Sequence, residues 1–141
     1  MELTVIQTNT CITTVIMICW LYVVSITVYQ CNAQGLMAEH YLVITSWPDL
    51  DGAKIQAERW LRKKMAASVN ILPQMDSMYH WKGELRHGTE HKIFIKTSAP
   101  RLEELRQEIR SAHPYAVAEI LYFEIDSGDP DYLDWINLST R

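Results

Sequence analysis

The side chains most able to do chemistry are spread over the second half of this sequence. One histidine, His113, precedes a proline, where an imidazole serves either as a metal ligand or as a positive charge beside the carbonyls of a helix end. Glu90, Lys96 and Glu119 offer charges of both signs. Because buried charges are expected to be paired, they either converge with Tyr115 in a cleft between subunits or form an ion-pair network that fixes subunit register.

Three aromatic side chains, Tyr79, Trp81 and Trp135, complete the set of candidates. A large ring can stack on a ligand in a cleft, and it can equally fill a core or a subunit interface. Both roles are open at this point, and both place these rings where two surfaces meet.

Enzyme motifs are missing from the sequence. It has no glycine-rich phosphate loop, no G-x-S-x-G, no H-E-x-x-H and no zinc-type pairing of cysteine and histidine. All 3 cysteines, which are Cys11, Cys19 and Cys31, precede residue 37. The remainder of the chain therefore has no thiolate chemistry, and we expect a protein that is not an enzyme.

Composition divides the chain into two parts. The 141 residues carry a net charge of -4 without a basic stripe, so nucleic acid is not an expected partner. No charged side chain lies between Glu2 and Glu39, whereas acids and bases are densely mixed after Glu39. We therefore separate a hydrophobic leader, residues 1–36, from a domain over residues 37–141.

The leader centres on the apolar residues 11–29, whose length is close to what a membrane span needs. No Lys or Arg precedes it, so it fits neither a secretory signal nor an oriented anchor well. Three interpretations stay open, namely a membrane anchor, a cleaved signal and a translation start at Met37. The third predicts a cytoplasmic protein, and the first predicts one associated with a membrane.

The domain is predicted to alternate strands and helices. Pro73 marks an irregularity in the second strand, Ser98 is the expected N-cap of the second helix, and Pro114 ends that helix. Asp129 and Pro130 open a short C-terminal helix. The predicted elements are a strand over 41–45, a helix over 50–65, a strand over 67–81, a turn over 82–88, a strand over 89–97, a helix after 98, a strand over 119–125 and a helix to 138.

This order, βαββαβ with a terminal helix, predicts an α+β ferredoxin-like fold with a long hairpin between its second and third strands. Two helices cover only one face of such a sheet. The middle strands hold too much apolar surface for solvent, which predicts burial against other subunits. The apolar residues on which this expectation rests are Ile71, Met78, Tyr79, Trp81, Phe94 and Ile95.

Several blocks of the domain resemble, in order and spacing, the CutA family of divalent-ion tolerance proteins. They are Ala66–Ile71 followed by Pro73, Tyr79-x-Trp81-x-Gly83, Glu90, Lys96-Thr97, His113-Pro114-Tyr115 with Glu119, and Tyr132-Leu133-x-Trp135-Ile136. The resemblance implies a ferredoxin-like fold, a homotrimer and a role in tolerance to divalent metals, copper above all.

The resemblance also implies a weakly held copper or other divalent cation, with His113 as the candidate ligand. Thr45, Ala112 and His113 occupy the positions at which ligands have been proposed in the family, and Ser68 replaces a usual cysteine. Only His113 among them is a strong donor, so a thiolate site is not expected.

Two other functions stay open. A trimer resembling PII signalling proteins would hold a small anionic effector in an intersubunit cleft near Lys96. A membrane-tethered interaction protein would result if residues 11–29 are a genuine anchor.

Overall fold

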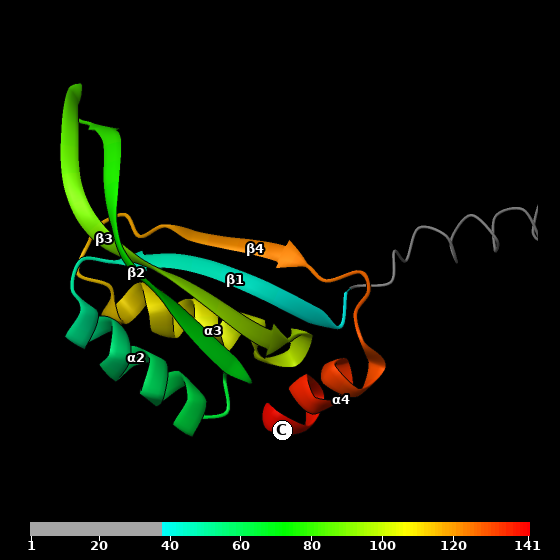
Figure 1. Cartoon of the computed structure of the whole chain (residues 1–141). Helices are drawn as coiled ribbons and strands as arrows, with labels where there is room; N and C mark the ends of the chain where they lie inside the picture. The colour runs from blue at the N-terminus through cyan, green and yellow to red at the C-terminus, as the bar shows by residue number, and fades with distance from the viewer. Residues whose placement is uncertain (1–37) are drawn as a thin grey trace, which may run out of the picture. The chain divides into compact units, whose positions relative to one another are not determined.

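Four strands and three helices follow one another in the computed structural model, which describes residues 38–141 (Figure 1). The predicted leader lies outside the described residues. The elements are β1 (His40–Trp47), α2 (Leu50–Arg62), β2 (Ser68–Trp81), β3 (Glu84–Ser98), α3 (Ala99–Ala112), β4 (Ile120–Glu124) and α4 (Pro130–Ser139).

The strands form one antiparallel sheet in the order β2-β3-β1-β4, with α2 and α3 against one face (Figure 1). The central strands β3 and β1 are each followed by a helix that returns the chain to an outer strand. This arrangement confirms the predicted ferredoxin-like α+β fold.

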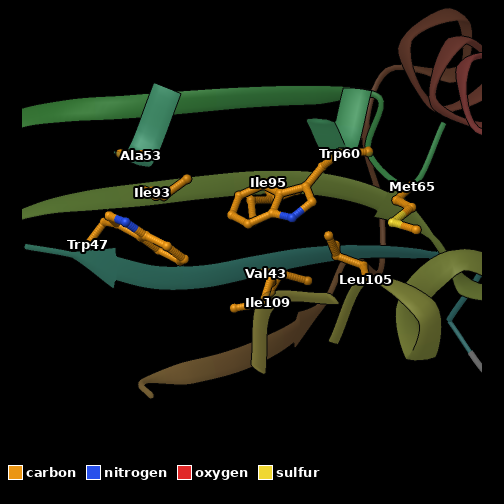
Figure 2. Packing of buried hydrophobic residues seen from close by; sticks show 10 residues of the cluster. Val43, Trp47, Ala53, Trp60, Met65, Ile93, Ile95, Leu105 and Ile109 are labelled. Atoms are coloured by element: carbon orange, nitrogen blue, oxygen red, sulfur yellow. The ribbon is translucent and has the colours of Figure 1, made fainter. Parts of the chain in front are cut away.

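The core fills the space between the sheet and the two helices. Alternate residues of β1 and β3 face it, because side chains alternate across a strand. Trp60 of α2 is completely buried, and its ring meets that of Trp47 edge-on with centroids 6.3 Å apart. Each such large apolar side chain contributes about 1.5–3 kcal/mol through burial. Figure 2 shows the cluster, in which the labelled residues are Val43, Trp47, Ala53, Trp60, Met65, Ile93, Ile95, Leu105 and Ile109.

The hairpin of β2 and β3 turns over two residues, Lys82 and Gly83. Their φ angles are 51° and 84°, and positive values at both positions match the twist of antiparallel strands. The predicted turn over residues 82–88 is therefore wrong, since β3 already begins at Glu84. The polar, glycine-containing segment is paired strand, and the hairpin extends past the rest of the sheet (Figure 1).

The predicted irregularity at Pro73 is confirmed. Pairing of β2 with β3 shifts register between Ile71 and Gln74, so Pro73 lies where no ladder hydrogen bond is required. The bulge separates the part of the hairpin that belongs to the sheet from the part that projects.

Two predicted helix features need correction. The first helix ends at Arg62 and not at residue 65, because Lys64 adopts a φ of 55°, although Met65 is still buried. Ser98 precedes α3 as predicted, but its side chain makes no capping bond. Its hydroxyl oxygen instead accepts a hydrogen bond of 2.8 Å from the Thr140 hydroxyl.

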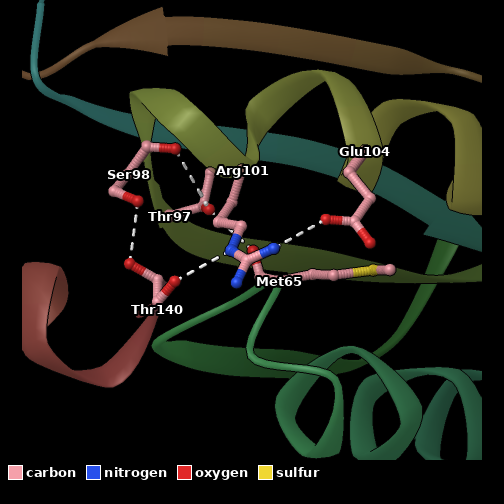
Figure 3. A network of polar contacts seen from close by, with 6 residues as sticks. All are labelled: Met65, Thr97, Ser98, Arg101, Glu104 and Thr140. Carbon is pink, nitrogen blue, oxygen red and sulfur yellow. Dashed lines mark hydrogen bonds and ion pairs between the residues drawn. The ribbon is translucent and has the colours of Figure 1, made fainter.

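A polar network fastens the C-terminal helix to the start of α3 (Figure 3). The Arg101 Nε donates to the carbonyl oxygen of Thr140 at 2.9 Å, and Thr97 Oγ1 donates to the carbonyl oxygen of Met65 at 2.7 Å. At the other end of α4, Asp129 Oδ1 accepts from the backbone N–H of Tyr132, which confirms the predicted cap. The Arg101–Thr140 bond and the Thr140–Ser98 bond hold the C-terminal end of α4 to the start of α3.

The sheet face opposite α2 and α3 carries apolar side chains, which we call the open sheet face. Leu121 and Phe123 of β4 are 47% and 49% exposed. Their pairing partners on β1 are Ile44 and Leu42, and Phe94 on β3 is paired with Ile44. All three side chains are partly exposed. The residues of the open sheet face are Leu42, Ile44, Phe94, Leu121 and Phe123.

The predicted composition of this face is only partly right. Phe94 lies on it, but Ile95 is completely buried beneath the helices and Ile71 packs against the same core. Met78, Tyr79 and Trp81 lie on the projecting part of the hairpin. The β4 residues Leu121 and Phe123 were missed because the strand register was not known.

Candidate functional site

A hollow of about 700 Å³ lies beside the projecting hairpin, and we call it the hairpin hollow. Its walls come from the end of β1, from β2 and β3, and from the segment that joins α3 to β4. It is open to solvent, and both polar and apolar side chains line it. The lining residues are Ser46, Asp76, Ser77, Met78, Tyr79, Trp81, Glu90, Pro114, Tyr115, Ala116, Val117 and Glu119.

Most of the side chains predicted to form a cleft meet in this hollow. Tyr79, Trp81, Glu90, Tyr115 and Glu119 all line it, although they come from three separate stretches of sequence. The long hairpin supplies the first three, and the segment after α3 supplies the other two. The arrangement exists within one chain.

Two predicted members lie elsewhere. Lys96 is paired across the sheet with Ser68 and Leu42, and its ammonium group donates to the side-chain oxygen of Asn70. Trp135 is on α4, where its ring packs against that of Tyr132 with centroids 5.3 Å apart. Neither side chain lines the hairpin hollow.

The cation that lies beside the hollow is Lys92, which sequence reasoning missed. Its Nζ donates to Glu119 Oε2 at 2.6 Å, and the two side chains are 22% and 35% exposed. Residues two apart on a strand share a face, so the spacing of Glu90 and Lys92 could have indicated that Lys92 lies on the same side of the sheet as Glu90.

Glu90 is a buried carboxylate, only 8% exposed. The Ser77 hydroxyl donates to its Oε2 at 2.9 Å, and the Tyr115 hydroxyl is its second partner. Burial, followed by this contact with the Glu90 carboxylate, raises the pKa of Tyr115 to about 12. None of the ion pairs found within residues 38–141 includes Glu90, so its partners there are neutral hydroxyl groups.

His113 lies behind the hollow rather than in its wall, with 9% of its surface exposed. Its Nε2 donates to the carbonyl oxygen of Ser46 at 2.8 Å, and its Nδ1 accepts from the backbone N–H of Tyr115 at 3.0 Å. A carbonyl only accepts and an N–H only donates, so the ring is the neutral Nε2–H tautomer. Both nitrogens are engaged, and a metal at Nδ1 would have to displace the Tyr115 N–H.

The other positions considered for metal ligation give no site within the part of the chain described. Thr45 is completely buried and faces the helices, and Ala112 has no donor. Residues 38–141 contain no group of three or more His, Cys, Asp or Glu side chains placed to hold a metal ion. Among the helices of these residues, none combines the length and hydropathy of a membrane span.

The order of elements and the sheet order place this chain among ferredoxin-like α+β proteins. The family profile described as CutA1 divalent ion tolerance protein matches residues 41–139. The chain belongs to that family, which confirms the predicted resemblance.

Relatives in animals and bacteria agree with this assignment. "Protein CutA homolog" of Xenopus laevis is 42% identical over 84 residues, which are 60% of this chain and 56% of that protein. "Divalent-cation tolerance protein CutA" of Citrobacter koseri is 34% identical over 111 residues, 78% of this chain and 96% of that one. The chain thus spans about half the length of the vertebrate relatives, 56% and 53% for the frog and Mus musculus proteins.

Solved structures show the same fold. The CutA1 structure from Oryza sativa superposes with a TM-score of 0.71 at 32% identity, over 74% of this chain and 95% of that one. The structure titled "Periplasmic divalent cation tolerance protein CutA" from Archaeoglobus fulgidus gives 0.70 at 32% identity, over 72% and 99%.

Proposed function

We propose that this chain acts in tolerance to divalent cations as a non-enzymatic homotrimer. Family membership supports the role in cation tolerance. The observation that carries the assembly is the open sheet face, where Leu121 and Phe123 are half exposed beside apolar neighbours. A contiguous apolar patch of this kind is typical of a subunit interface.

The oligomeric state tests the assembly directly. We expect the native mass of the full chain, measured by mass spectrometry or sedimentation, to be three times that of one chain. A monomer at micromolar concentration would contradict the proposal.

The proposed cation is copper or another divalent metal, held weakly. Asp76, Glu90 and Glu119 supply carboxylate oxygens around the hairpin hollow, and His113 lies behind it, bonded to the backbone N–H of Tyr115. Oxygen donors that do not converge on one point, with an imidazole already hydrogen-bonded, favour low affinity.

A copper titration of the metal-free full chain, followed by calorimetry, tests this cation. We expect affinity to fall in His113→Ala and to be unchanged in His87→Ala, which alters an exposed hairpin residue. Absence of binding at micromolar copper would exclude a direct cation site.

A second candidate is a signalling or scaffold trimer that holds a small effector, and the volume of the hairpin hollow favours it. An anionic effector at Lys96 has less support, because that lysine lies outside the hollow and contacts Asn70. A thermal shift across a metabolite panel tests the role, with Lys96→Ala distinguishing the two locations.

The compartment we propose is the cytoplasm, and residues 1–36 decide it. N-terminal sequencing of the native protein distinguishes the alternatives. A chain that starts at Met37 or Ala38 supports the cytoplasm, whereas retention of residues 11–29 in a membrane fraction supports a tethered interaction protein.

A further inference from the structure

We propose that the hairpin hollow binds a small organic cation, an ammonium or guanidinium group carried on an aromatic or other apolar body. The inference names a ligand class for the second candidate function and rests on that role. It does not depend on the cation-tolerance role, because it requires no metal ion.

Charge is the first argument. The lining holds the carboxylates Asp76, Glu90 and Glu119, and none of the side chains that line it, all within residues 38–141, is basic. Lys92 compensates Glu119 from outside the lining. The hollow is therefore negative, and a field of one sign attracts ligands of the other.

The burial of Glu90 strengthens this argument. The residue is only 8% exposed, and the partners found for its carboxylate in residues 38–141 are the neutral hydroxyls of Ser77 and Tyr115. Burying a charge is costly unless an opposite charge accompanies it. A cationic head group in the hollow would supply the missing charge where Glu90 lines the wall.

The aromatic walls determine what kind of cation fits. Tyr79, Trp81 and Tyr115 line the same hollow as the carboxylates. Aromatic faces attract ammonium and guanidinium groups, and they also pack against an apolar body. A volume of about 700 Å³ is in the range of small-molecule sites.

A bare metal ion fits this hollow poorly. Its three carboxylates are not among any cluster in residues 38–141 that could hold an ion, and hard cations need several oxygen ligands at close distance. The aromatic rings offer such an ion no ligand. An organic cation needs only one carboxylate and a face of π electrons.

The test uses three probes that share a phenethyl body and differ only in the head group, namely phenethylammonium, 2-phenylethanol and 3-phenylpropionate. Calorimetry on the full chain should give the cation at least about tenfold tighter binding than the alcohol, since a buried charge pair adds that much affinity. The carboxylate probe should not bind.

Variants identify the source of the preference. Glu90→Gln keeps the shape of the side chain. It should weaken binding of phenethylammonium about tenfold and leave binding of 2-phenylethanol unchanged. Glu58→Gln, an exposed carboxylate on α2, is the matched control and should change nothing. Trp81→Leu should weaken the cation more than the alcohol; Trp81 is 39% exposed on the hairpin, so this variant is expected to fold even if Glu90→Gln does not.

Each contrary outcome has one meaning. If the alcohol or the carboxylate probe binds as tightly as the amine, the proposal is wrong and the effector role stands. If no probe binds at millimolar concentration, the proposal is wrong. If Glu90→Gln changes the oligomeric mass and no amine binds, a second copy meets the charge and the proposal is wrong. Native mass and copper titration of the same samples report separately on the proposed trimer and cation.

Discussion

The Nε2–H of His113 donates to the backbone carbonyl oxygen of Ser46 at 2.8 Å, which ties the end of α3 to β1. The same ring accepts the backbone N–H of Tyr115 through Nδ1. Tyr115 in turn lines the hairpin hollow beside Glu90. The imidazole is therefore a positioning group that holds one wall of the hollow against the sheet.

Replacing this histidine should reduce stability. His113→Ala removes two hydrogen bonds and leaves the Ser46 carbonyl without its partner, so the free energy of unfolding should fall by about 2–4 kcal/mol. Urea denaturation measures it. His87→Ala, on the exposed part of the hairpin, is the control and should stay within about 0.5 kcal/mol of the parent. An unchanged midpoint in His113→Ala would remove the positioning role.

Much of the fold followed from sequence because local signals agreed with each other. The helix stripe of Ala53, Ala57 and Trp60 and the proline at Pro73 each specified an element or its irregularity. The turn at Lys82 and Gly83 was mislocated, because polar residues with glycines are common in both loops and exposed hairpin strands.

The site was less predictable, since it depends on register between segments far apart in the chain. The pairing expected of buried charges suggested that Glu90 and Tyr115 meet, and both line the hollow, but it also suggested Lys96 where Lys92 lies. Which nitrogen of His113 carries a proton depends on Ser46, a residue 67 positions away. No spacing rule reports such a contact.

Thr45 offers a stabilising substitution. Its Oγ1 is buried and has no hydrogen-bond partner within the described residues, so Thr45→Val removes an unsatisfied polar group and keeps the side-chain shape. We expect the free energy of unfolding to rise by about 1 kcal/mol.

The matched control for this substitution is Thr97→Val. That hydroxyl donates to the carbonyl oxygen of Met65 at 2.7 Å, so its loss should lower stability by about 1–2 kcal/mol. In denaturant titrations, the change in the free energy of unfolding should be positive for Thr45→Val and negative for Thr97→Val if the hydrogen bonds account for the difference. A loss of stability in both would contradict the prediction.

Gly52 in the first turn of α2 should not tolerate a methyl group. Alanine is ordinarily the better helix former by about 1 kcal/mol. Here a Cβ would lie 2.7 Å from Trp47 Nε1 and 2.8 Å from Asp49 Oδ2, against the N-cap itself. We expect Gly52→Ala to cost about 1–3 kcal/mol in thermal or denaturant unfolding.

Gly88→Ala is the control for this clash. A Cβ at residue 88 has no neighbouring atom within 4 Å, so the substitution should be nearly neutral. Equal stability of Gly52→Ala and the parent protein would show that the start of α2 adjusts to admit the methyl group.

The pH dependence of stability should carry a signature of Tyr115. Its pKa is raised from the ordinary 10.0 to about 12, first by burial and then by the Glu90 carboxylate. The unfolded chain therefore releases this proton first as pH rises. The stabilisation linked to Tyr115 is complete below pH 10 and is lost as pH rises through about 12.

Phenolate absorbance tests this ordering. We expect a late ionisation near pH 12 that disappears in Tyr115→Phe and moves to lower pH in Glu90→Gln, though it stays above 10 because burial is the larger cause. Tyr132→Phe, on α4 and outside the hollow, should leave the late step in place. A Glu90→Gln curve identical to that of the parent would mean that the carboxylate does not act on the phenol.

The open sheet face should control assembly. Phe123→Asp places a charge among Ile44, Leu121 and their neighbours, and burying an unpaired charge is strongly unfavourable. We expect the trimer to dissociate at micromolar concentration while the secondary structure is kept, because Phe123 is already 49% exposed in the single chain. Sedimentation and circular dichroism measure the two properties. Ile55→Asp is the matched control, because Ile55 is 64% exposed on α2, away from this face. If both variants retain the parent mass, the subunits associate through another surface.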